Sequence, residues 1–170
     1  MKNALLVIDM QNDYLWEARK PKFAYNTAKL VDDVNTLIHA YADAGHDVIY
    51  IRHLIQNLPT NRLLFGYSIA GTPGAELYSG LDIVSKYRFD KLFGDAFTNR
   101  YLERMVRERG YAQLCLCGLD EAGCVTATAL GAKKRGFEAV ICERGVATVM
   151  PEKKVSKARE KLGQAGIRRI

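Results

Sequence analysis

Three polar residues that follow apolar segments could together break a bond to a carbonyl carbon. Asp9 comes directly after the apolar run Ala4–Ile8. Lys86 follows a short apolar pair, and Cys124 lies a few residues beyond another apolar segment. A thiolate is a strong nucleophile, a carboxylate can carry its proton, and a nearby ammonium favours the anionic sulfur. The trio predicts nucleophilic catalysis by Cys124, assisted by Asp9 and Lys86.

Cys124 stands where a thiolate would be stabilised. The segment Gly118–Gly123 forms a turn after a strand, and Val125–Ala129 opens a helix. The free amides and the positive dipole end at a helix N-terminus lower a thiol pKa and can bind an oxyanion. A cysteine at such a junction often only packs, however, and Lys86 could be an ordinary surface residue. Asp9 is harder to explain in that way, because a carboxylate after an apolar run must be paired, solvated or functional.

The hydrophobic pattern predicts strands and helices that alternate along the chain. The predicted strands are Ala4–Ile8, Val48–Ile51, Asp82–Val84, Ala112–Cys117, Glu138–Cys142 and an edge strand that begins at Gly166. The predicted helices are Asn26–Ala44, Asn99–Arg109, Gly123–Arg135 and Pro151–Gln164. Such an alternation gives right-handed crossovers and a sheet covered on both faces. We therefore expect a three-layer α/β/α, doubly wound, Rossmann-like fold with a mostly parallel six-stranded sheet.

In such a sheet, ligands bind beyond the carboxyl ends of the strands. Asp9, Lys86 and Cys124 would all lie at that edge. The segment between Arg52 and Gly80 is rich in Pro, Gly, Asn and Thr and has no clear periodicity. A connection of this length is uncommon unless it has a function, so we expect it to contact the substrate.

The composition is that of an ordinary globular protein. With 170 residues, 48% of them hydrophobic and 26% charged, the chain predicts one domain over residues 1–170. No apolar run is long enough to cross a bilayer and no signal-peptide pattern is present, so we expect a cytoplasmic protein that does not act at a membrane. The four cysteines are then expected to be reduced thiols. Cys115 and Cys117 share one face of a strand, which suits core packing better than a zinc site.

The net charge of +6 does not favour a nucleic acid as partner. The basic residues are spread over several helices and mixed with acidic ones, and they are densest at Lys133–Arg135, Lys153-Lys154 and Arg168-Arg169. Solvated helix faces explain this pattern. The expected partner is a small-molecule substrate.

Four segments carry a family resemblance. They are Leu6–Asp13, Gly71–Leu77, Lys86–Asp90 and the stretch from Gly118 to Phe137. In this order they resemble the opening motif, the central glycine-rich segment, the lysine motif and the nucleophile segment of the isochorismatase-like cysteine hydrolases. That superfamily includes nicotinamidases and carbamoylsarcosine amidases. The resemblance covers nearly the whole chain.

The resemblance implies a catalytic triad of Asp9, Lys86 and Cys124. Cys124 would attack the carbonyl carbon, ammonia or an amine would leave, and water would hydrolyse the thioester. The backbone amides of Asp120 and Cys124 would form the oxyanion hole, and the peptide bond between Leu119 and Asp120 would be cis, as it often is in the family. Family members commonly form dimers or tetramers, so a homo-oligomer is implied.

Departures from the family pattern narrow the chemistry. Nicotinamidases usually carry an Asp-x-His metal motif after the second strand, but the matching stretch here is Ile51–His53 and no histidine follows it. We therefore expect neither a metal nor another cofactor. Isochorismatases that cleave a vinyl ether lack the nucleophilic cysteine, so Cys124 argues against that reaction. Arg144 stands where the family commonly has Asp, and its role is left open.

Several residues are candidates for substrate binding. They are Tyr14, Trp16, Phe23, His53 and Arg88. The three aromatic residues could cover a planar substrate or simply pack, and His53 could line the pocket or be a polar residue at a strand end. Arg88 could hold a carboxylate or pair with a structural acid. Arg19, Lys20 and Lys22 would suit an anionic substrate if they are not merely solvated charges.

The leading hypothesis is a cysteine hydrolase that cleaves the C–N bond of a small amide, ureide or carbamoyl compound without a metal. The alternative enzyme is a nicotinamidase, which would release ammonia from nicotinamide and bind zinc or iron. The alternative outside catalysis is a binding or scaffold protein of the same fold, because a fold alone does not secure a function.

Overall fold

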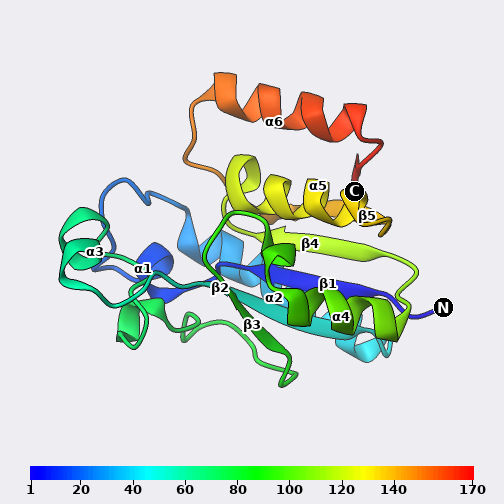
Figure 1. Cartoon of the computed structure of the whole chain (residues 1–170), viewed down its shortest axis with the longest axis horizontal. Helices are drawn as coiled ribbons and strands as arrows, with labels where there is room; N and C mark the ends of the chain where they lie inside the picture. The colour runs from blue at the N-terminus through cyan, green and yellow to red at the C-terminus, as the bar shows by residue number, and fades with distance from the viewer.

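The strands of the protein form one sheet in which all neighbouring strands are parallel. The computed structural model describes all residues from 1 to 170, and Figure 1 shows their arrangement. The six strands lie in the order β3-β2-β1-β4-β5-β6. In chain order they are β1 (Ala4–Ile8), β2 (Asp47–His53), β3 (Arg88–Lys91), β4 (Leu114–Gly118), β5 (Ala139–Val146) and β6 (Arg168–Arg169). The predicted doubly wound fold is confirmed.

Helices cover both faces of the sheet and complete the three layers. α2 (Thr27–Asp43) packs on one face, and α4 (Arg100–Arg109) and α5 (Thr126–Lys134) pack on the other. α6 (Glu152–Gln164) lies outside α5 on that second side, as Figure 1 shows. None of these helices is both long enough and apolar enough to span a membrane.

The helix ends follow from capping residues in the sequence. The side-chain oxygens of Asn26 and Asn99 accept backbone N–H groups at the start of α2 and α4. Gly110 ends α4 in the left-handed conformation, with a φ angle of +59°. The predicted boundaries of these two helices are confirmed to within one residue.

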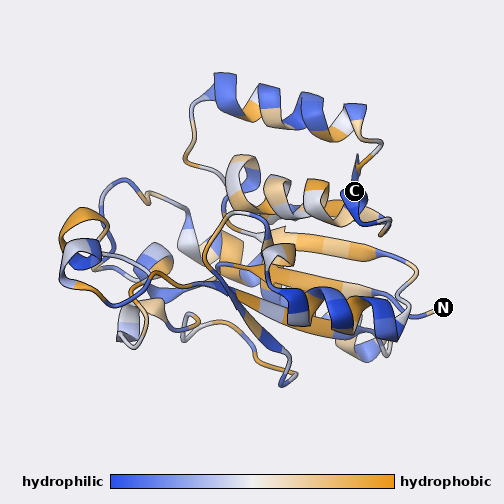
Figure 2. Ribbon diagram, viewed as in Figure 1, coloured by the Kyte–Doolittle hydropathy of each residue, from blue (hydrophilic) through white to orange (hydrophobic).

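Alternate residues of the central strands point to opposite faces, and both sets are apolar. Leu5 and Val7 of β1 pack towards α2, whereas Leu6 and Ile8 pack towards α4 and α5. Figure 2 shows the central strands as apolar ribbons beside helices that carry many polar residues. A strand buried on both faces needs no polar alternation, which explains the uninterrupted run Ala4–Ile8.

One predicted strand is wrong. Asp82–Val84 lies in no strand, and the third strand is instead β3. β3 is at the edge of the sheet and pairs only with β2, and its residues Arg88 and Asp90 are exposed. An exposed edge strand needs no continuous apolar run, so the hydrophobic pattern could not identify it.

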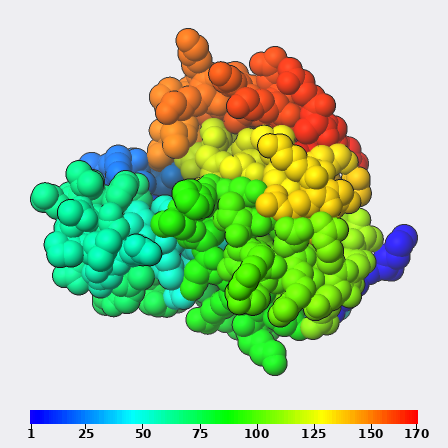
Figure 3. Space-filling model, viewed as in Figure 1, coloured from blue at the N-terminus to red at the C-terminus, as the bar shows by residue number.

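The segment between β2 and β3 forms a lobe that begins at the carboxyl end of β2. It contains α3 (Pro59–Leu64) and η1 (Pro73–Ala75), and η1 packs against α1 (Asn12–Leu15). Figure 3 shows this lobe, coloured cyan to green, beside the body of the molecule. The buried side chain of Gln11 joins the lobe to the sheet by hydrogen bonds to the backbone of His53 and of η1. These short elements agree with the lack of a clear periodicity between Arg52 and Gly80.

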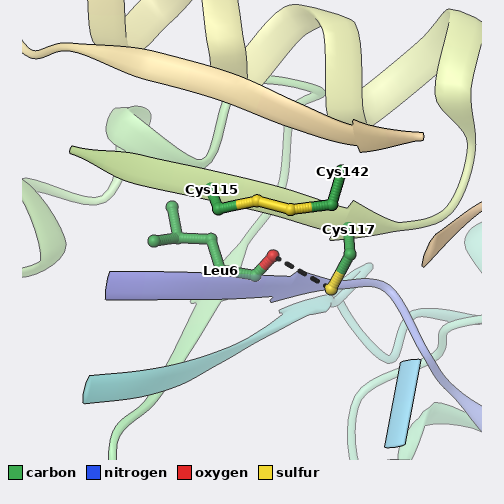
Figure 4. Close-up of a disulfide and its surroundings, with 4 residues drawn as sticks. All are labelled: Leu6, Cys115, Cys117 and Cys142. Atoms are coloured by element: carbon green, nitrogen blue, oxygen red, sulfur yellow. Dashed lines mark hydrogen bonds between the residues drawn. A yellow bond between two sulfur atoms is a disulfide. The ribbon is translucent and has the colours of Figure 1, made fainter. Parts of the chain in front are cut away.

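Two of the four cysteines form a disulfide. Cys115 of β4 is bonded to Cys142 of β5, as Figure 4 shows, while Cys117 and Cys124 are free. The expectation of four reduced thiols is therefore wrong, because the adjacent strands bring these two side chains together on the face that α2 covers. Cys117 is buried on the same face, with its sulfur 3.7 Å from the carbonyl oxygen of Leu6. The core packing predicted for Cys115 and Cys117 is confirmed.

Candidate active site

The candidate catalytic residues lie at the carboxyl ends of four adjacent strands. β1 and β4 are neighbours at the point where the strand order reverses, and ligands bind at such points in doubly wound sheets. Asp9 follows β1, and Cys124 follows β4 after a turn. Lys91 is the last residue of β3, and it pairs in register with His53 at the end of β2.

Lys91 connects the carboxylate and the thiol. Its Nζ lies 2.8 Å from Oδ2 of Asp9 and 3.2 Å from Sγ of Cys124. The side chains of Lys91 and Asp9 are 0% and 4% exposed, so their ion pair is shielded from water. Cys124 is half-buried and lines a cavity, which leaves its sulfur open to a ligand. A nucleophile, a cation and a carboxylate are therefore in one cluster.

The ammonium comes from Lys91, and the prediction of Lys86 for this place is wrong. Lys86 is exposed in the connection that precedes β3. Because all strands run parallel, only the carboxyl end of β3 reaches the edge of the sheet where Asp9 lies. The signal that would have found Lys91 is the one that marks Asp9, namely a charged residue at the end of a strand.

Asp9 has an unusual backbone conformation. Its φ angle is +54°, in the left-handed region that few residues except Gly, Asn and Asp adopt. Its N–H still donates to the carbonyl oxygen of Ile51 at 2.9 Å, which ties the turn to β2. Oδ2 of Asp9 accepts from Lys91, whereas the buried Oδ1 has no hydrogen-bond partner. An unpaired carboxylate oxygen in this position is suited to accept a proton.

The protonation of the site follows from burial and neighbouring charges. Burial, reinforced by the Asp9 carboxylate and only partly opposed by Lys91, raises the pKa of the Cys124 thiol to about 12. Burial lowers the pKa of the Lys91 ammonium, but the Asp9 carboxylate and the contact with Cys124 outweigh that effect and raise the pKa above its ordinary value. The burial of the thiol therefore opposes the resting thiolate that the sequence predicted. At neutral pH the site holds a protonated thiol beside an ammonium.

Cys124 lies in a tight turn in front of α5 and outside the helix itself. This turn is η3 (Glu121–Val125), a π-type turn with a non-helical kink at Gly123. The side chain of Asp120 caps it by accepting a backbone N–H within the turn at 2.9 Å. Because α5 begins only at Thr126, the helix dipole that was expected to favour a thiolate does not start at the sulfur.

Asp120 has a fully bonded carboxylate and a free backbone N–H. The carboxylate also accepts hydrogen bonds from the hydroxyls of Tyr25 (2.9 Å) and Thr148 (2.8 Å) and from the N–H of Val149 (3.0 Å). The N–H of Asp120 donates to no acceptor in the protein, and Asp120 lines the cavity. The peptide bond between Leu119 and Asp120 is not cis, so that expectation is wrong.

A cavity of about 410 Å³ opens over the thiol, a size that suits a small molecule. Most of its lining is apolar or aromatic. The lining residues are Asp9, Tyr14, Lys22, Phe23, Tyr25, His53, Tyr67, Leu119, Asp120, Gly123, Cys124, Val149 and Met150. The ring of Phe23 meets the rings of Tyr14 and Tyr67 edge to face, with centroid distances of 4.8 Å and 5.1 Å. These three rings form a single aromatic wall.

A chain of hydrogen bonds fixes the protonation of His53. Its Nε2 lies 3.0 Å from the carbonyl oxygen of Leu92, which can only accept, so Nε2 carries the proton. Nδ1 then accepts from the hydroxyl of Tyr14 at 3.2 Å, and Tyr14 in turn accepts from Ser68 at 2.7 Å. Burial lowers the pKa of His53 and raises that of Tyr14, so both side chains are neutral. They hold the aromatic wall and the residue after Lys91 in place.

Three of the predicted substrate-binding residues line the cavity and two do not. Tyr14, Phe23 and His53 are part of its wall. Trp16 follows α1 and lies in a separate shallow depression beside the lobe. Arg88 is exposed on the edge strand β3, because it stands at the start of that strand and not at its carboxyl end.

Besides Lys91, which contacts the thiol from outside the cavity wall, sequence reasoning missed several residues that line the cavity. They are Tyr25, Tyr67, Leu119, Val149 and Met150. Tyr67 comes from the irregular segment between β2 and β3, for which substrate contact was expected. Arg19 is neither a solvated charge nor part of the cavity, because its guanidinium donates to the carbonyl oxygens of Trp16, Phe23 and Tyr25.

Ion pairs tie the nucleophile turn to the end of the chain. Glu121, with a side chain only 6% exposed, pairs with Arg159 of α6 at 2.9 Å and with Arg169 of β6 at 3.0 Å. Arg144, whose role the sequence left open, pairs with the buried Asp33 of α2. The first set holds the turn that carries Cys124, and the second joins β5 to α2.

The residues at the end of β2 do not fit a metal ion. The guanidinium of Arg52 lies between Asp90 (2.8 Å) and Glu76 (2.7 Å), so these carboxylates are already paired with a cation. His53 is engaged through both ring nitrogens. No three His, Cys, Asp or Glu side chains lie close enough together to hold a metal. No catalytic step is therefore assigned to one.

Comparison with known proteins gives matches along nearly the whole chain. Residues 3–168 match the family model of the isochorismatase domain. An uncharacterized isochorismatase family protein of Bacillus subtilis, YddQ, is 26% identical over 149 residues, which are 87% of this chain and 79% of the relative. The nicotinamidase/pyrazinamidase PncA from Bacillus subtilis has a similar structure, with a TM-score of 0.83, 29% identity and 99% of both chains covered. The pyrazinamidase of Pyrococcus horikoshii, solved in complex with zinc, gives a TM-score of 0.78 and 28% identity over 100% of this chain and 99% of that one.

Proposed function

Because the chain belongs to the isochorismatase family, we propose that it is a cysteine hydrolase that cleaves the C–N bond of a small amide, ureide or carbamoyl compound. The observation that carries this proposal is the contact of Lys91 with both Cys124 and Asp9 at the floor of a cavity. The names of the similar solved structures, a nicotinamidase/pyrazinamidase and a pyrazinamidase, support amide hydrolysis.

In the first half of the reaction, Asp9 takes the proton of the Cys124 thiol as the sulfur attacks the carbonyl carbon. Proton transfer accompanies the attack because the thiol is protonated at rest. The backbone amides of Asp120 and Cys124 stabilise the oxyanion. Asp9 then gives the proton to the nitrogen, the C–N bond breaks, and ammonia or an amine leaves a thioester behind.

In the second half, Asp9 takes a proton from a water molecule, whose oxygen attacks the thioester carbon. The bond between carbon and sulfur breaks, the carboxylic or carbamic acid leaves, and Asp9 returns the proton to the sulfur of Cys124. Lys91 stabilises the negative charge in both halves, because it contacts the carboxylate and the sulfur at once.

A nicotinamidase is the second candidate, and two observations favour it. The solved structures with 28–29% identity carry that name or the name pyrazinamidase, and the aromatic wall of Tyr14, Phe23 and Tyr67 could cover a planar ring. The pairing of Arg52 with Glu76 and Asp90 argues against a metal-dependent form. Release of ammonia from nicotinamide, together with bound zinc or iron in the purified protein, would favour this candidate.

A screen for ammonia or amine release over small amides, ureides and carbamoyl acids tests the proposed function. We expect the wild type to hydrolyse at least one of these compounds and the Cys124→Ser variant to be nearly inactive on it. Equal turnover by the two proteins would contradict the nucleophile. Failure to hydrolyse any compound would favour a binding protein of the same fold.

The proposal also covers the oligomeric state of the protein and its location in the cell. The family resemblance supports a homo-oligomer, either a dimer or a tetramer, and sedimentation velocity of the purified protein tests it against a monomer. A cytoplasmic location remains a prediction from the sequence. Disulfides are rare in reducing compartments, so the redox state of Cys115 and Cys142 in cells tests that prediction.

A further inference from the structure

The mouth of the cavity carries a cation that no anion neutralises. Lys22 lines the same cavity as Cys124 and is exposed to solvent. Its Nζ lies 4.2 Å from the ring centroid of Tyr67 and 4.9 Å from that of Phe23, and it forms no ion pair. Contacts with two ring faces hold an ammonium in place but do not cancel its charge. Lys22 is therefore a fixed positive charge that a ligand can reach.

A second ammonium adds to this charge. Nζ of Lys20 lies 5.8 Å from the ring centroid of Tyr67 and donates to the carbonyl oxygen of Phe65, outside the cavity. Burial and the charge of Lys20 both lower the pKa of Lys22, which shows that the ammonium of Lys22 lacks a compensating anion. An anionic ligand at this place would relieve the repulsion between the two lysines.

The other charged groups of the cavity are already engaged. Asp9 is paired with Lys91, and His53 is neutral. The carboxylate of Asp120 receives four hydrogen bonds at the floor, close to the thiol. A ligand with a negative group is therefore repelled from the floor and attracted to Lys22, which fixes its orientation with the opposite end at the sulfur.

We propose that Lys22 selects substrates in which the amide or carbamoyl group is accompanied by a carboxylate. The substrate class is then the small amide-bearing or carbamoyl-bearing acids, with the carboxylate at Lys22 and the scissile carbonyl at Cys124. This inference rests on the proposed function, because it names the substrate of the same site. The aromatic wall of Tyr14, Phe23 and Tyr67 contacts the apolar part between the two ends.

Pairs of compounds that differ only in the charged group provide the test. Suitable pairs are succinamate and isohexanamide, N-carbamoylglycine and isobutylurea, and terephthalamate and para-isopropylbenzamide, because an isopropyl group has the shape of a carboxylate. The quantity measured is the ratio of kcat/KM for the acid to kcat/KM for its neutral partner. In the wild type we expect this ratio to be about tenfold or more in at least one pair.

Three variants test whether the preference for the acid depends on the ammonium of Lys22. Lys22→Met keeps most of the side-chain length but removes the charge, and it should lower the ratio by about tenfold. Lys22→Arg restores a cation and should keep the preference for the acid. Lys20→Met is the matched control, because it removes a charge beside Tyr67 but outside the cavity, and it should leave most of the ratio intact. An unchanged ratio in Lys22→Met, or a wild type that prefers the neutral member of every pair, would overturn the inference.

Binding separates this inference from the proposed function. Calorimetric titration of Cys124→Ala with the same pairs needs no turnover. Hydrolysis of neutral amides without a preference for the acids would support the proposed function but contradict the role of Lys22. The opposite result is a protein that hydrolyses none of the compounds but binds the acids more tightly, with a preference that Lys22→Met abolishes. It would support the role of Lys22 and contradict the proposed hydrolase. Binding of neither member would overturn the inference.

Discussion

At the residue scale, the site depends on an ammonium that contacts both partners of a proton transfer. Lys91 is fully buried and bonded to Asp9 and to the sulfur of Cys124. When the thiol gives its proton to Asp9, negative charge moves from the carboxylate to the sulfur. The same cation stabilises the state before and the state after this transfer, so the transfer needs little rearrangement.

Replacement of Lys91 should therefore abolish most of the activity. In Lys91→Met the sulfur and the carboxylate lose their shared cation, and we expect kcat/KM to fall by at least about a hundredfold. Lys86→Met is the matched control, since Lys86 is exposed before β3, and it should stay within about twofold of the wild type. A larger loss in Lys86→Met than in Lys91→Met would show that the wrong lysine has been assigned.

The raised pKa of Cys124 predicts how its thiol reacts when no substrate is bound. Only the thiolate is alkylated, and with a pKa of about 12 its fraction rises about tenfold for each pH unit up to that value. We therefore expect the rate at which iodoacetamide modifies Cys124 to keep rising between neutral pH and pH values of about 10. The rate can be followed by mass spectrometry of the Cys124 peptide. A plateau below neutral pH would instead show a resting thiolate.

Part of this site could be read from single residues in the sequence. Asp9 and Cys124 were identifiable because a polar residue directly after a buried strand, and a cysteine on the turn after another, are rare without a reason. Lys91 could not be identified in this way, because it ends an edge strand whose sequence is polar and because Lys86 lies a few residues away in the same segment. The thiol pKa was also missed, since it depends on burial and on the distance to Asp9.

At the scale of elements, the nucleophile turn is supported from the end of the chain. Glu121 of η3 pairs with Arg159 of α6 and with Arg169 of β6, and its N–H donates to the carbonyl oxygen of Ala147. At the other side of the turn, Gly118 has a φ angle of +103°, and a Cβ there would lie 2.1 Å from the carbonyl oxygen of Ile8. Only glycine lets β4 pass β1 so closely.

Removal of the charge of Glu121 should loosen this turn. Glu121→Gln leaves two arginines without their shared carboxylate, and we expect the free energy of unfolding to fall by about 2 kcal/mol, measured by urea denaturation. Because the turn carries Asp120 and Cys124, kcat should fall as well. Glu143→Gln is the control, since Glu143 is 52% exposed and pairs only with Arg169. Equal stability of the two variants would contradict a supporting role for Glu121.

The elements themselves were largely predictable, and the exceptions have a physical reason. The strands β1, β2, β4 and β5 are apolar because both of their faces are buried, and the helices between them carry capping residues. The hydrophobic pattern did not predict β3, because this edge strand is exposed and needs no apolar run. The helix after Cys124 starts later than predicted because a π-type turn, for which the sequence has no periodic signal, precedes it.

At the scale of the whole molecule, a disulfide joins two strands inside the core. Cys115 and Cys142 are separated by 27 residues, and a closed loop of this length is expected to stabilise the fold by roughly 3 kcal/mol. Reduction should therefore lower the denaturation midpoint of the wild type. The double variant Cys115→Ser and Cys142→Ser should not respond to the reductant. Four reactive thiols in the unfolded, unreduced wild type would contradict the disulfide.

The shape of the cavity also depends on the fold of the whole molecule. Its wall combines residues at or beyond the carboxyl ends of β1, β2, β4 and β5 with Tyr67 of the lobe, and these segments are far apart in the chain. Sequence patterns place residues on elements, but they do not give the distances between side chains of different elements. The fold could therefore be predicted more fully than the pocket, and the pairing of Arg52 with Glu76 and Asp90, which argues against a metal site at the end of β2, could not be predicted either.

The central claim is that Cys124 becomes covalently bound to the acyl part of the substrate. The most direct measurement is acid quenching of the enzyme during turnover of a slow substrate, followed by mass spectrometry of its peptides. We expect the acyl mass on the peptide that contains Cys124, and on no other, with no adduct in Cys124→Ala. Sustained turnover with an unmodified Cys124 peptide, or undiminished turnover by Cys124→Ala, would contradict the account.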